Sequence, residues 1–133
     1  MAANLTSENQ QTYDGGHGAR ILQGLRPDLC LIQEFNYGSN SPAAVRTFVD
    51  TTFGTEFSYY REAGAQIPNG IISRHPIVAS GEWDDPAVSN RDFAWARIDV
   101  PGPTDLWAVS VHFLTSGSTV RDTEARALRE FIN

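Results

Sequence analysis

The chain has 133 residues, of which 41% are hydrophobic and 20% are charged, a length and composition typical of one small globular domain. Its 16 acidic residues outnumber its 10 basic ones and give a formal net charge of −6, which argues against nucleic-acid binding through a broad positive surface. Every basic residue is arginine, so a P-loop lysine and a Schiff-base lysine are excluded.

The remaining composition excludes further classes of protein. The single cysteine, Cys30, cannot form an internal disulfide or a multi-cysteine zinc site, and we expect it to be an inert core residue. No apolar run approaches the ~20 residues of a membrane span. The first residues also lack the basic and apolar stretches of a signal peptide. Because cytoplasmic and secreted proteins both tolerate this composition, the sequence leaves the compartment open.

The first third of the chain predicts a strand, a helix and a second strand. Residues 1–6 are apolar and small, as at the end of a strand. Residues 17–25 predict a helix with one apolar face, which ends at Arg26-Pro27 because a proline disfavours helical geometry in the residue before it. That face consists of Ile21, Leu22 and Leu25. Residues 28–34 read as a short buried strand that becomes polar at its end.

A second helix and a run of strands follow. Ser41 as a cap and Pro42 at the first helical position start a helix whose apolar residues are Val45, Phe48, Val49 and Phe53, and Gly54 is a plausible stop. Segments rich in aromatic and β-branched residues then predict strands at 56–62, 70–74, 77–83, 93–100 and 106–113. The overall order is mixed α/β.

The chain closes with a predicted helix from Ser118-Thr119. Its apolar stripe consists of Val120, Ala127, Leu128 and Phe131. On its outer face, Asp122, Arg126 and Glu130 lie four residues apart and are expected to pair in solvent.

Two polar residues end apolar strands and are candidates for chemistry. Glu34 follows a buried strand at its carboxyl end, where open α/β sheets commonly bind ligands, although it could equally be the first solvated residue after the strand. His112 ends the strand at 106–113, on the same predicted face as Ala108 and Ser110, with Trp107 on the other face. A hydrogen-bonded core histidine explains His112 as well.

Three other polar residues are weaker candidates when taken alone. Asn69 precedes a glycine and an apolar pair, which is typical of a turn into a strand. Asn4 is a polar residue near a strand end, and the default explanation of Arg91 beside Asp92 is a surface ion pair. His17 and His75 read as loop residues.

The order of these residues resembles the endonuclease/exonuclease/phosphatase superfamily, the DNase I-like proteins. Asn4 resembles the family's first asparagine, Gln33-Glu34 its metal-binding glutamate motif, and Asn69 to Arg74 its central strand. Val109 to Leu114 is similar to the strand that ends in the family's histidine, and the helix from Arg121 follows it, with Glu124 where a glutamine is common. The resemblance implies an α/β (α+β) fold, a DNase I-like four-layer α/β-sandwich.

The resemblance also implies a divalent-metal-dependent phosphoesterase of the nuclease or phosphodiesterase type. Glu34 and Asn4 would bind Mg²⁺ or Mn²⁺, His112 would donate to a phosphate oxygen in the transition state, and Asn69 would shape the pocket. Arg91 is a weaker candidate for a substrate-phosphate contact. The implied partner is a phosphate-ester substrate, with nucleic acid among the candidates.

Residues 1–133 match only about the first half of the family's catalytic domain. They lack a Gly-Asp-Phe-Asn-like segment and a Ser-Asp-His segment, and the pair Asp14 and His17 does not match the latter. A site without its general base would give little catalysis. We therefore expect a partial domain that self-associates or binds a complementary chain; the alternative is a catalytically inactive fragment or a binding or assembly module.

Overall fold

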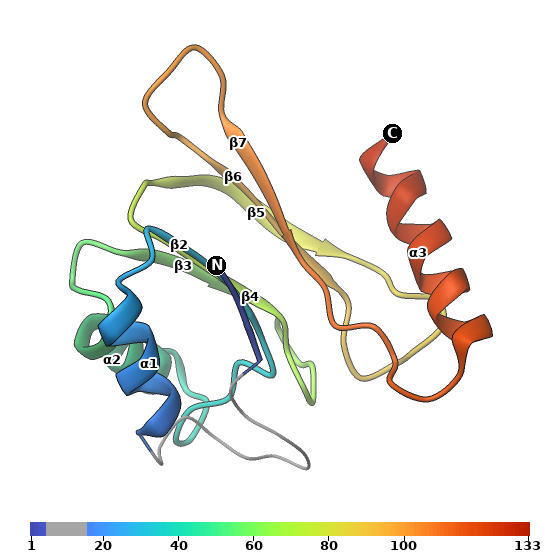
Figure 1. Cartoon of the computed structure of the whole chain (residues 1–133), viewed down its shortest axis with the longest axis horizontal. Coiled ribbons are helices and arrows are strands. Elements are labelled where there is room, and N and C mark those ends of the chain that lie inside the picture. The colour runs from blue at the N-terminus through green and yellow to red at the C-terminus, as the bar shows by residue number, and fades with distance from the viewer. Residues whose placement is uncertain (5–15) are drawn as a thin grey trace.

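The computed structural model describes residues 1–4 and 16–133, so Leu5 and Thr6 of the first predicted strand, and Asp14, lie outside the described residues. Within these ranges the chain folds into two packed sheets with helices on both outer sides (Figure 1). No helix in this part of the chain is long and apolar enough to cross a membrane.

The first sheet has the strand order β1-β2-β4-β3. Its strands are β1 (Ala2–Asn4), β2 (Leu29–Gln33), β3 (Ser58–Arg61) and β4 (Gly70–Ser73). Strands β1 and β2 are parallel, with Asn4 beside Gln33, whereas β4 is antiparallel to both β2 and β3. The parallel register brings the carboxyl ends of β1 and β2 to the same edge of the sheet.

The second sheet is an antiparallel meander of β5 (Ile77–Trp83), β6 (Phe93–Ile98) and β7 (Leu106–Ser110). Its inner face packs on the first sheet through a small apolar cluster in which Ile71 of β4 meets Ala96, Ile98 and Ala108. The exact match of β5 to the predicted strand at 77–83 follows from its bounding turn residues, while the other predicted strands are shortened at their ends.

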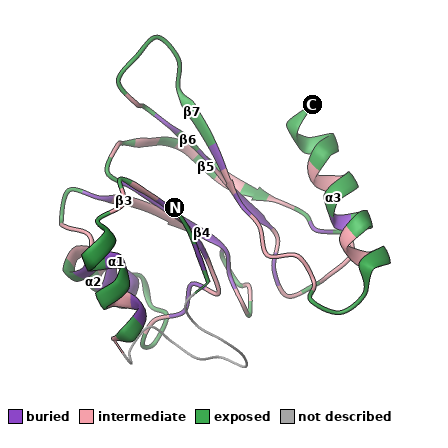
Figure 2. Ribbon diagram, in the orientation of Figure 1, coloured by how far each residue is buried: buried purple, intermediate pink, exposed green. Residues whose placement is uncertain are grey.

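Helices α1 (His17–Leu25) and α2 (Pro42–Thr52) cover the outer face of the first sheet. The main core lies between these helices and the first sheet, where the ribbon is largely buried (Figure 2). Its fully buried side chains include Leu22, Ile32, Phe35, Phe48 and Val49. The predicted start of α2 is confirmed, because the Ser41 hydroxyl oxygen accepts a hydrogen bond from the Ala44 N–H at 3.2 Å and Pro42 opens the helix.

The predicted apolar face of α1 is wrong at two of its three positions. Ile21 is 49% exposed and Leu25 is 62% exposed, whereas Leu22 is fully buried. The helix touches the core along the line of Gly18 and Leu22, four residues apart, so its buried face is rotated away from the other two side chains.

The predicted strand at 106–113 is also wrong at its end, since β7 stops at Ser110. Ser110 pairs with Ala94 of β6, so the residue opposite His112 would be Asp92. The N–H of Asp92 bonds instead to the carboxylate of Glu62 at 2.7 Å, so this donor does not pair with the segment of His112. His112 therefore lies in the loop that follows β7.

Helix α3 (Ser118–Ile132) lies beyond the second sheet, and its predicted apolar stripe is only partly covered. Phe131 stacks on Trp83 with ring centroids 5.4 Å apart but stays 44% exposed. The buried residue of α3 is a carboxylate, Glu124. On the outer face, Arg126 pairs with Asp122 as expected.

Candidate functional site

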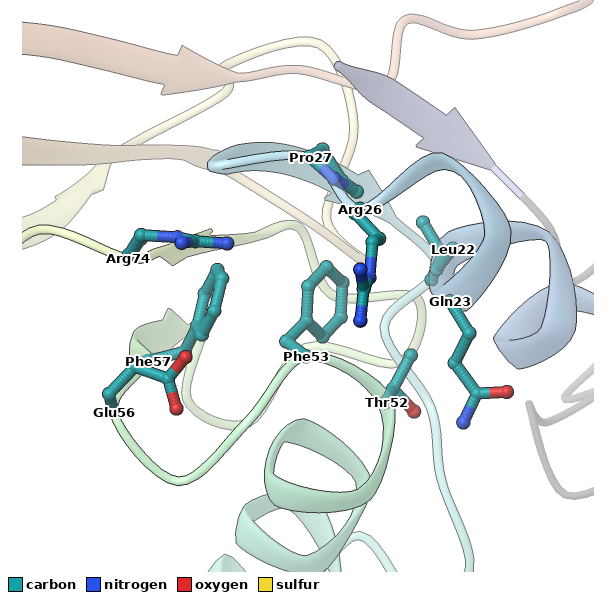
Figure 3. Close-up of a pocket in the computed structure, with 9 residues that line it drawn as sticks. All are labelled: Leu22, Gln23, Arg26, Pro27, Thr52, Phe53, Glu56, Phe57 and Arg74. Carbon is teal, nitrogen blue, oxygen red and sulfur yellow. The ribbon is translucent and has the colours of Figure 1, made fainter.

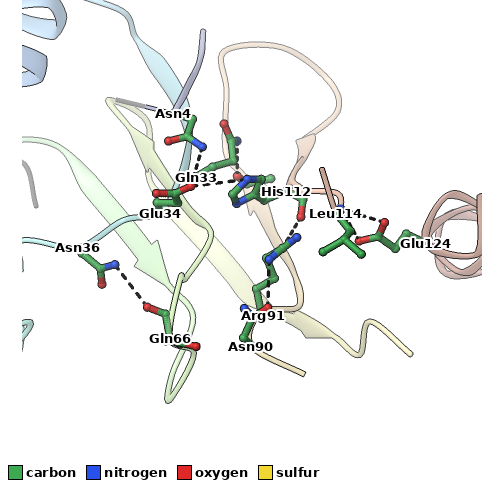
Figure 4. Close-up of polar contacts among 11 residues, drawn as sticks. Asn4, Gln33, Glu34, Asn36, Gln66, Asn90, Arg91, His112, Leu114 and Glu124 are labelled. Carbon is green, nitrogen blue, oxygen red and sulfur yellow. Dashed lines mark hydrogen bonds and ion pairs between the residues drawn. The ribbon is translucent and has the colours of Figure 1, made fainter. Parts of the chain in front are cut away.

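Three of the predicted site residues meet at the carboxyl edge of β1 and β2 (Figure 4). The side-chain amide of Asn4 donates to Glu34 Oε1 at 3.1 Å, and His112 Nε2 lies 3.7 Å from the same oxygen. The side chains of Glu34 and His112 are only 12% and 16% exposed. Segments that are far apart in the sequence thus place a carboxylate, an amide and an imidazole around one point.

The backbone at Glu34 is unusual for a residue with a side chain. Its φ angle is +53°, in the left-handed region that glycine favours, and its carbonyl accepts the N–H of Asn36 at 2.7 Å in a tight turn. This turn ends β2 and aims the carboxylate toward Asn4. Local strain of this kind persists only where the surrounding structure holds the residue in place.

A buried hydrogen-bond bridge joins the two sheets beside this point. The side-chain amide of Gln33 donates to Ser110 Oγ at 3.0 Å, and the Ser110 hydroxyl donates to the carbonyl of Ile32 at 3.1 Å. The bridge ties the end of β7 to the end of β2, and so brings the His112 loop to Glu34. Sequence reasoning assigned Ser110 no role, although its place on the predicted face of His112 was a usable signal.

The environment of His112 favours a neutral ring. Burial lowers the pKa of His112, and the nearby Arg91 cation lowers it further, while Glu34 and Glu124 oppose the change. The Nδ1 atom is buried and has no hydrogen-bond partner among the described residues. A neutral imidazole in this position can donate one N–H to an acceptor such as a phosphate oxygen.

Arg91 supports His112 through the backbone. It is 6% exposed, its Nε donates to the carbonyl of His112, and its Nη1 donates to Asn90 Oδ1 at 3.1 Å. Sequence reasoning missed this role, for which the sequence carries no signal. The phosphate contact of Arg91 remains a prediction.

Asn69 is fully buried just before β4, and its contacts lead away from Glu34. Its side-chain amide donates to the carbonyl of Asp92 at 2.7 Å, and its backbone N–H donates to Glu62 Oε2 at 2.5 Å. The side-chain oxygen is buried and has no partner among the described residues. The structure therefore attaches Asn69 to the site through loops, with no hydrogen bond or ion pair to Asn4, Glu34 or His112 within the described ranges.

Glu124 pins the loop that carries His112. Both of its carboxylate oxygens lie 3.0 Å from the N–H of Leu114, and Arg121 Nη1 donates to the carbonyls of Leu114 and Thr115 at 3.1 and 2.9 Å. Burial raises the pKa of Asp85, and the nearby charge of Glu124 raises it further. Glu124, the glutamate at a position where the family commonly has glutamine, thus anchors α3 to the loop of His112.

The side chains that meet at Glu34 suit a hard divalent cation, which prefers oxygen ligands, better than a transition metal. Among the described residues no group of three or more His, Cys, Asp or Glu side chains could hold a metal ion. Glu34 offers a carboxylate, the ligand type that Mg²⁺ takes when water and substrate phosphate complete its shell, and the NH₂ group of Asn4 faces that carboxylate. The donor set is therefore compatible with a magnesium-type site built on one carboxylate.

A separate cavity of about 410 Å³ lies at the other end of β2, between α1, α2 and the end of β4 (Figure 3). Arg74 lies over the ring of Phe57 at 5.3 Å and pairs with Asp28 at 2.8 Å. Arg26 and Glu56 also line the cavity, and Asp28 offsets the charge of Arg74 from outside its lining. The charged and aromatic side chains around this cavity therefore favour no particular class of ligand.

The first sheet is mixed, with one parallel strand pair, and the second is antiparallel; packed face to face with helices outside, they form a DNase I-like α/β sandwich. No family model matches the sequence, and no curated protein matches it significantly. The solved structures that do match share this fold.

The chain is similar to D. rerio TDP2 humanized by 14 mutations, with a TM-score of 0.70 and 17% identity over 98% of this chain and 54% of that one. It is also similar to an endonuclease/exonuclease/phosphatase family protein from Leptotrichia buccalis C-1013-b, with a TM-score of 0.62 and 15% identity over 85% of this chain and 54% of that one. A 3′ phosphatase from Neisseria, bound to product DNA hairpin, matches with a TM-score of 0.60 and 16% identity over 93% and 49%. The chain spans about half the length of these structures.

Proposed function

We propose that this chain carries the amino-terminal half of the site of a divalent-metal-dependent phosphoesterase, of the nuclease or phosphodiesterase type. The observation that carries the proposal is the meeting of Asn4, Glu34 and His112 at one carboxylate oxygen in a DNase I-like fold. The names of the similar structures, a 3′ phosphatase and an endonuclease/exonuclease/phosphatase family protein, support the class of reaction.

In this proposal Glu34 and the amide oxygen of Asn4 hold Mg²⁺ or Mn²⁺. A cation bound there would offset charge on phosphate oxygens and orient the substrate. The hydrogen bond from Asn4 Nδ2 fixes the rotamer of Glu34, and so presents the carboxylate in one direction. His112 donates its Nε2–H to a nonbridging phosphate oxygen, where negative charge grows in the transition state.

We further propose that the substrate is a phosphate ester and that nucleic acid is the first class to test. A D. rerio TDP2 structure complexed with single-strand DNA product matches this chain with a TM-score of 0.66, at 18% identity over 91% of this chain and 52% of that one. Because the net charge of this chain is −6, contacts to phosphate would be local ones, made by the site and by Arg91.

The test compares hydrolysis of single-stranded DNA and of a chromogenic phosphodiester by the parent chain and by Glu34→Gln, with and without Mg²⁺. Glu56→Gln is the matched control, because it makes the same change at an exposed glutamate in the separate cavity. Because half of a site without its general base gives little catalysis, we expect slow Mg²⁺-dependent hydrolysis. This rate should fall at least tenfold in Glu34→Gln and stay unchanged in Glu56→Gln. Equal activity in both variants would refute the site.

A second candidate function is a binding or assembly module without catalysis, and one surface favours it. Trp107, Trp95, Trp83 and Phe131 form a continuous row across the second sheet to α3, with neighbouring ring centroids 5.4 to 5.8 Å apart. Beside the row lies a groove of about 420 Å³ lined by Trp83, Trp107, Val109, Phe131 and Ile132. Trp107 is 55% exposed and Ile132 60%, unusually open for large apolar side chains.

We propose that this aromatic groove binds a second copy of the chain or a complementary chain that extends the sandwich. Light scattering after size-exclusion chromatography tests the first occupant. A dimer that dissociates in Trp107→Ser, with the control Val78→Ser unchanged at another exposed apolar position, supports self-association. A stable monomer excludes the second copy as the occupant of the groove. A monomer that also hydrolyses nothing would favour a module that assembles with a complementary chain.

A further inference from the structure

A buried carboxylate that the proposed chemistry does not use, Glu62, lies just after β3 and is 1% exposed. Its Oε2 accepts the N–H of Asn69 at 2.5 Å, and its Oε1 accepts the N–H of Asp92 at 2.7 Å. Its own N–H donates to the carbonyl of Asn69 at 3.1 Å. Together with the bond from the Asn69 side chain to the Asp92 carbonyl, these contacts form a closed set.

This set connects the two sheets at the end of the sandwich that carries the site. Asn69 belongs to the loop between β3 and β4 of the first sheet, and Asp92 directly precedes β6 of the second. Arg91, the next residue back, donates to the carbonyl of His112. The carboxylate of Glu62 therefore bonds to Asn69 directly. It is connected to His112 indirectly, through its bond to Asp92 and the bond from the neighbouring Arg91 to the His112 carbonyl.

The contacts require an ionised acceptor. A carboxylate has lone pairs on both oxygens and can accept from two N–H donors, whereas a carboxylic acid or an amide presents a donor to one of them. Glutamine at this position would keep the shape of the side chain and set its NH₂ group against a backbone N–H. Loss of a buried acceptor is costly because no water replaces it.

The charges around Glu62 oppose that ionisation. Burial raises the pKa of Glu62 to about 7, the carboxylates of Asp92 and Glu82 raise it, and the two backbone donors lower it. Arg61, the adjacent cation, donates elsewhere, with its Nε to the carbonyl of Phe35 at 2.6 Å. Tyr60 also faces this region, and burial with the charge of Glu82 raises its pKa to about 12, so it stays neutral.

We propose that Glu62 is a positioning residue of the site: its ionised carboxylate holds the Asn69 loop and the segment of Arg91 and Asp92 in the arrangement that completes the site. This inference rests on the proposed function for its catalytic consequence, while the bracing itself is a property of the fold. Protonation of Glu62 releases one of the two segments and loosens the site on the acid side of neutrality.

The bracing is tested first by ¹H–¹⁵N NMR of the whole chain between pH 3 and 9. We expect the amide protons of Asn69 and Asp92 to shift together, with one midpoint near pH 7, because both bond to the same carboxylate. In Glu62→Gln this common titration disappears, while Glu56→Gln retains it. A midpoint near 4.5, separate midpoints for the two amides, or titration that survives in Glu62→Gln overturns the proposal. The parent titration needs no variant to fold.

The catalytic consequence is tested by the pH profile of hydrolysis. We expect kcat of Glu62→Gln to fall about tenfold with KM changed less than twofold, and the acid limb near pH 7 to disappear from its profile. A Glu62→Gln enzyme with the parent kcat and acid limb overturns the positioning role and leaves the proposed function standing. If the parent hydrolyses nothing, the proposed function fails and the amide titration alone decides whether Glu62 holds the two segments.

Discussion

Arg91 has two possible roles, support of His112 and contact with substrate phosphate, and substitution separates them. Arg91→Met removes the charge-assisted hydrogen bond to the carbonyl of His112 and leaves that acceptor without its donor. Such bonds contribute about 1.5–3 kcal/mol. Because methionine keeps part of the buried apolar contact, we expect the free energy of unfolding to fall by about 2 kcal/mol. Arg91→Lys keeps the charge and loses the planar fork, so we expect a smaller loss of about 1 kcal/mol.

The assay is urea unfolding, with the titration of the His112 ring followed by NMR. Since the Arg91 cation lowers the pKa of His112, Arg91→Met should move that pKa upward toward its usual value. Arg97→Met is the control, because Arg97 is an exposed member of a surface ion pair with Asp105 and should change stability by less than about 1 kcal/mol. Parent-like stability and His112 titration in Arg91→Met, with only substrate affinity lost, would refute the supporting role.

Three further predictions concern the elements that hold the site. Ser110→Ala removes the bridge from Gln33 and should lower the free energy of unfolding by about 1–3 kcal/mol in urea, and an unchanged unfolding midpoint would contradict the role of the bridge. Gly70→Ala would bring a Cβ within 2.5 Å of the Phe35 ring and 2.8 Å of a backbone oxygen, so we expect about 1–3 kcal/mol lost in thermal unfolding, and an unchanged Tm would contradict that packing. Because burial raises the folded-state pKa of Glu62 from 4.5 to about 7, ionisation of this carboxylate costs global stability even though only the ionised form accepts both N–H bonds. The contribution to stability is therefore present below pH 4.5 and is lost as pH rises through 7; the parent should lose up to about 3 kcal/mol more than Glu62→Gln over that range, and parallel pH profiles would contradict it.

Local signals predicted most of the elements. The serine and proline that begin α2 act within one turn, and the turn residues around 77–83 bound β5 without help from distant segments. The fold class was predicted from a resemblance carried by the order of motifs along the chain, from Asn4 through Gln33-Glu34 and the Asn69 strand to His112 and the final helix. In the structure β1 and β2 pair side by side, whereas β7 belongs to the second sheet. The DNase I-like prediction is accordingly confirmed at the level of the fold.

Other features depend on groups that only the folded chain brings together. β7 ends at Ser110, and the N–H of Asp92, which would lie opposite His112, bonds instead to Glu62, 30 residues away along the chain. Likewise Trp107 was predicted on the opposite face from His112, and that face proved to be the outer one, which α3 covers only in part, through Phe131 on Trp83, so that Trp107 stays 55% exposed. Alternation along a strand defines two faces, and only the packing partner decides which of them is buried.

By itself, then, the sequence determined what depends on neighbours along the chain: the caps, the strand periods, the absence of lysine chemistry and the order of the site residues. Tertiary structure decided which face of α1 is buried, where β7 ends and which carboxylates lose water. Those outcomes follow from desolvation and from hydrogen bonds between distant segments, as at Glu62 and Glu124, where burial turns ordinary acidic residues into acceptors that hold the loops of the candidate site.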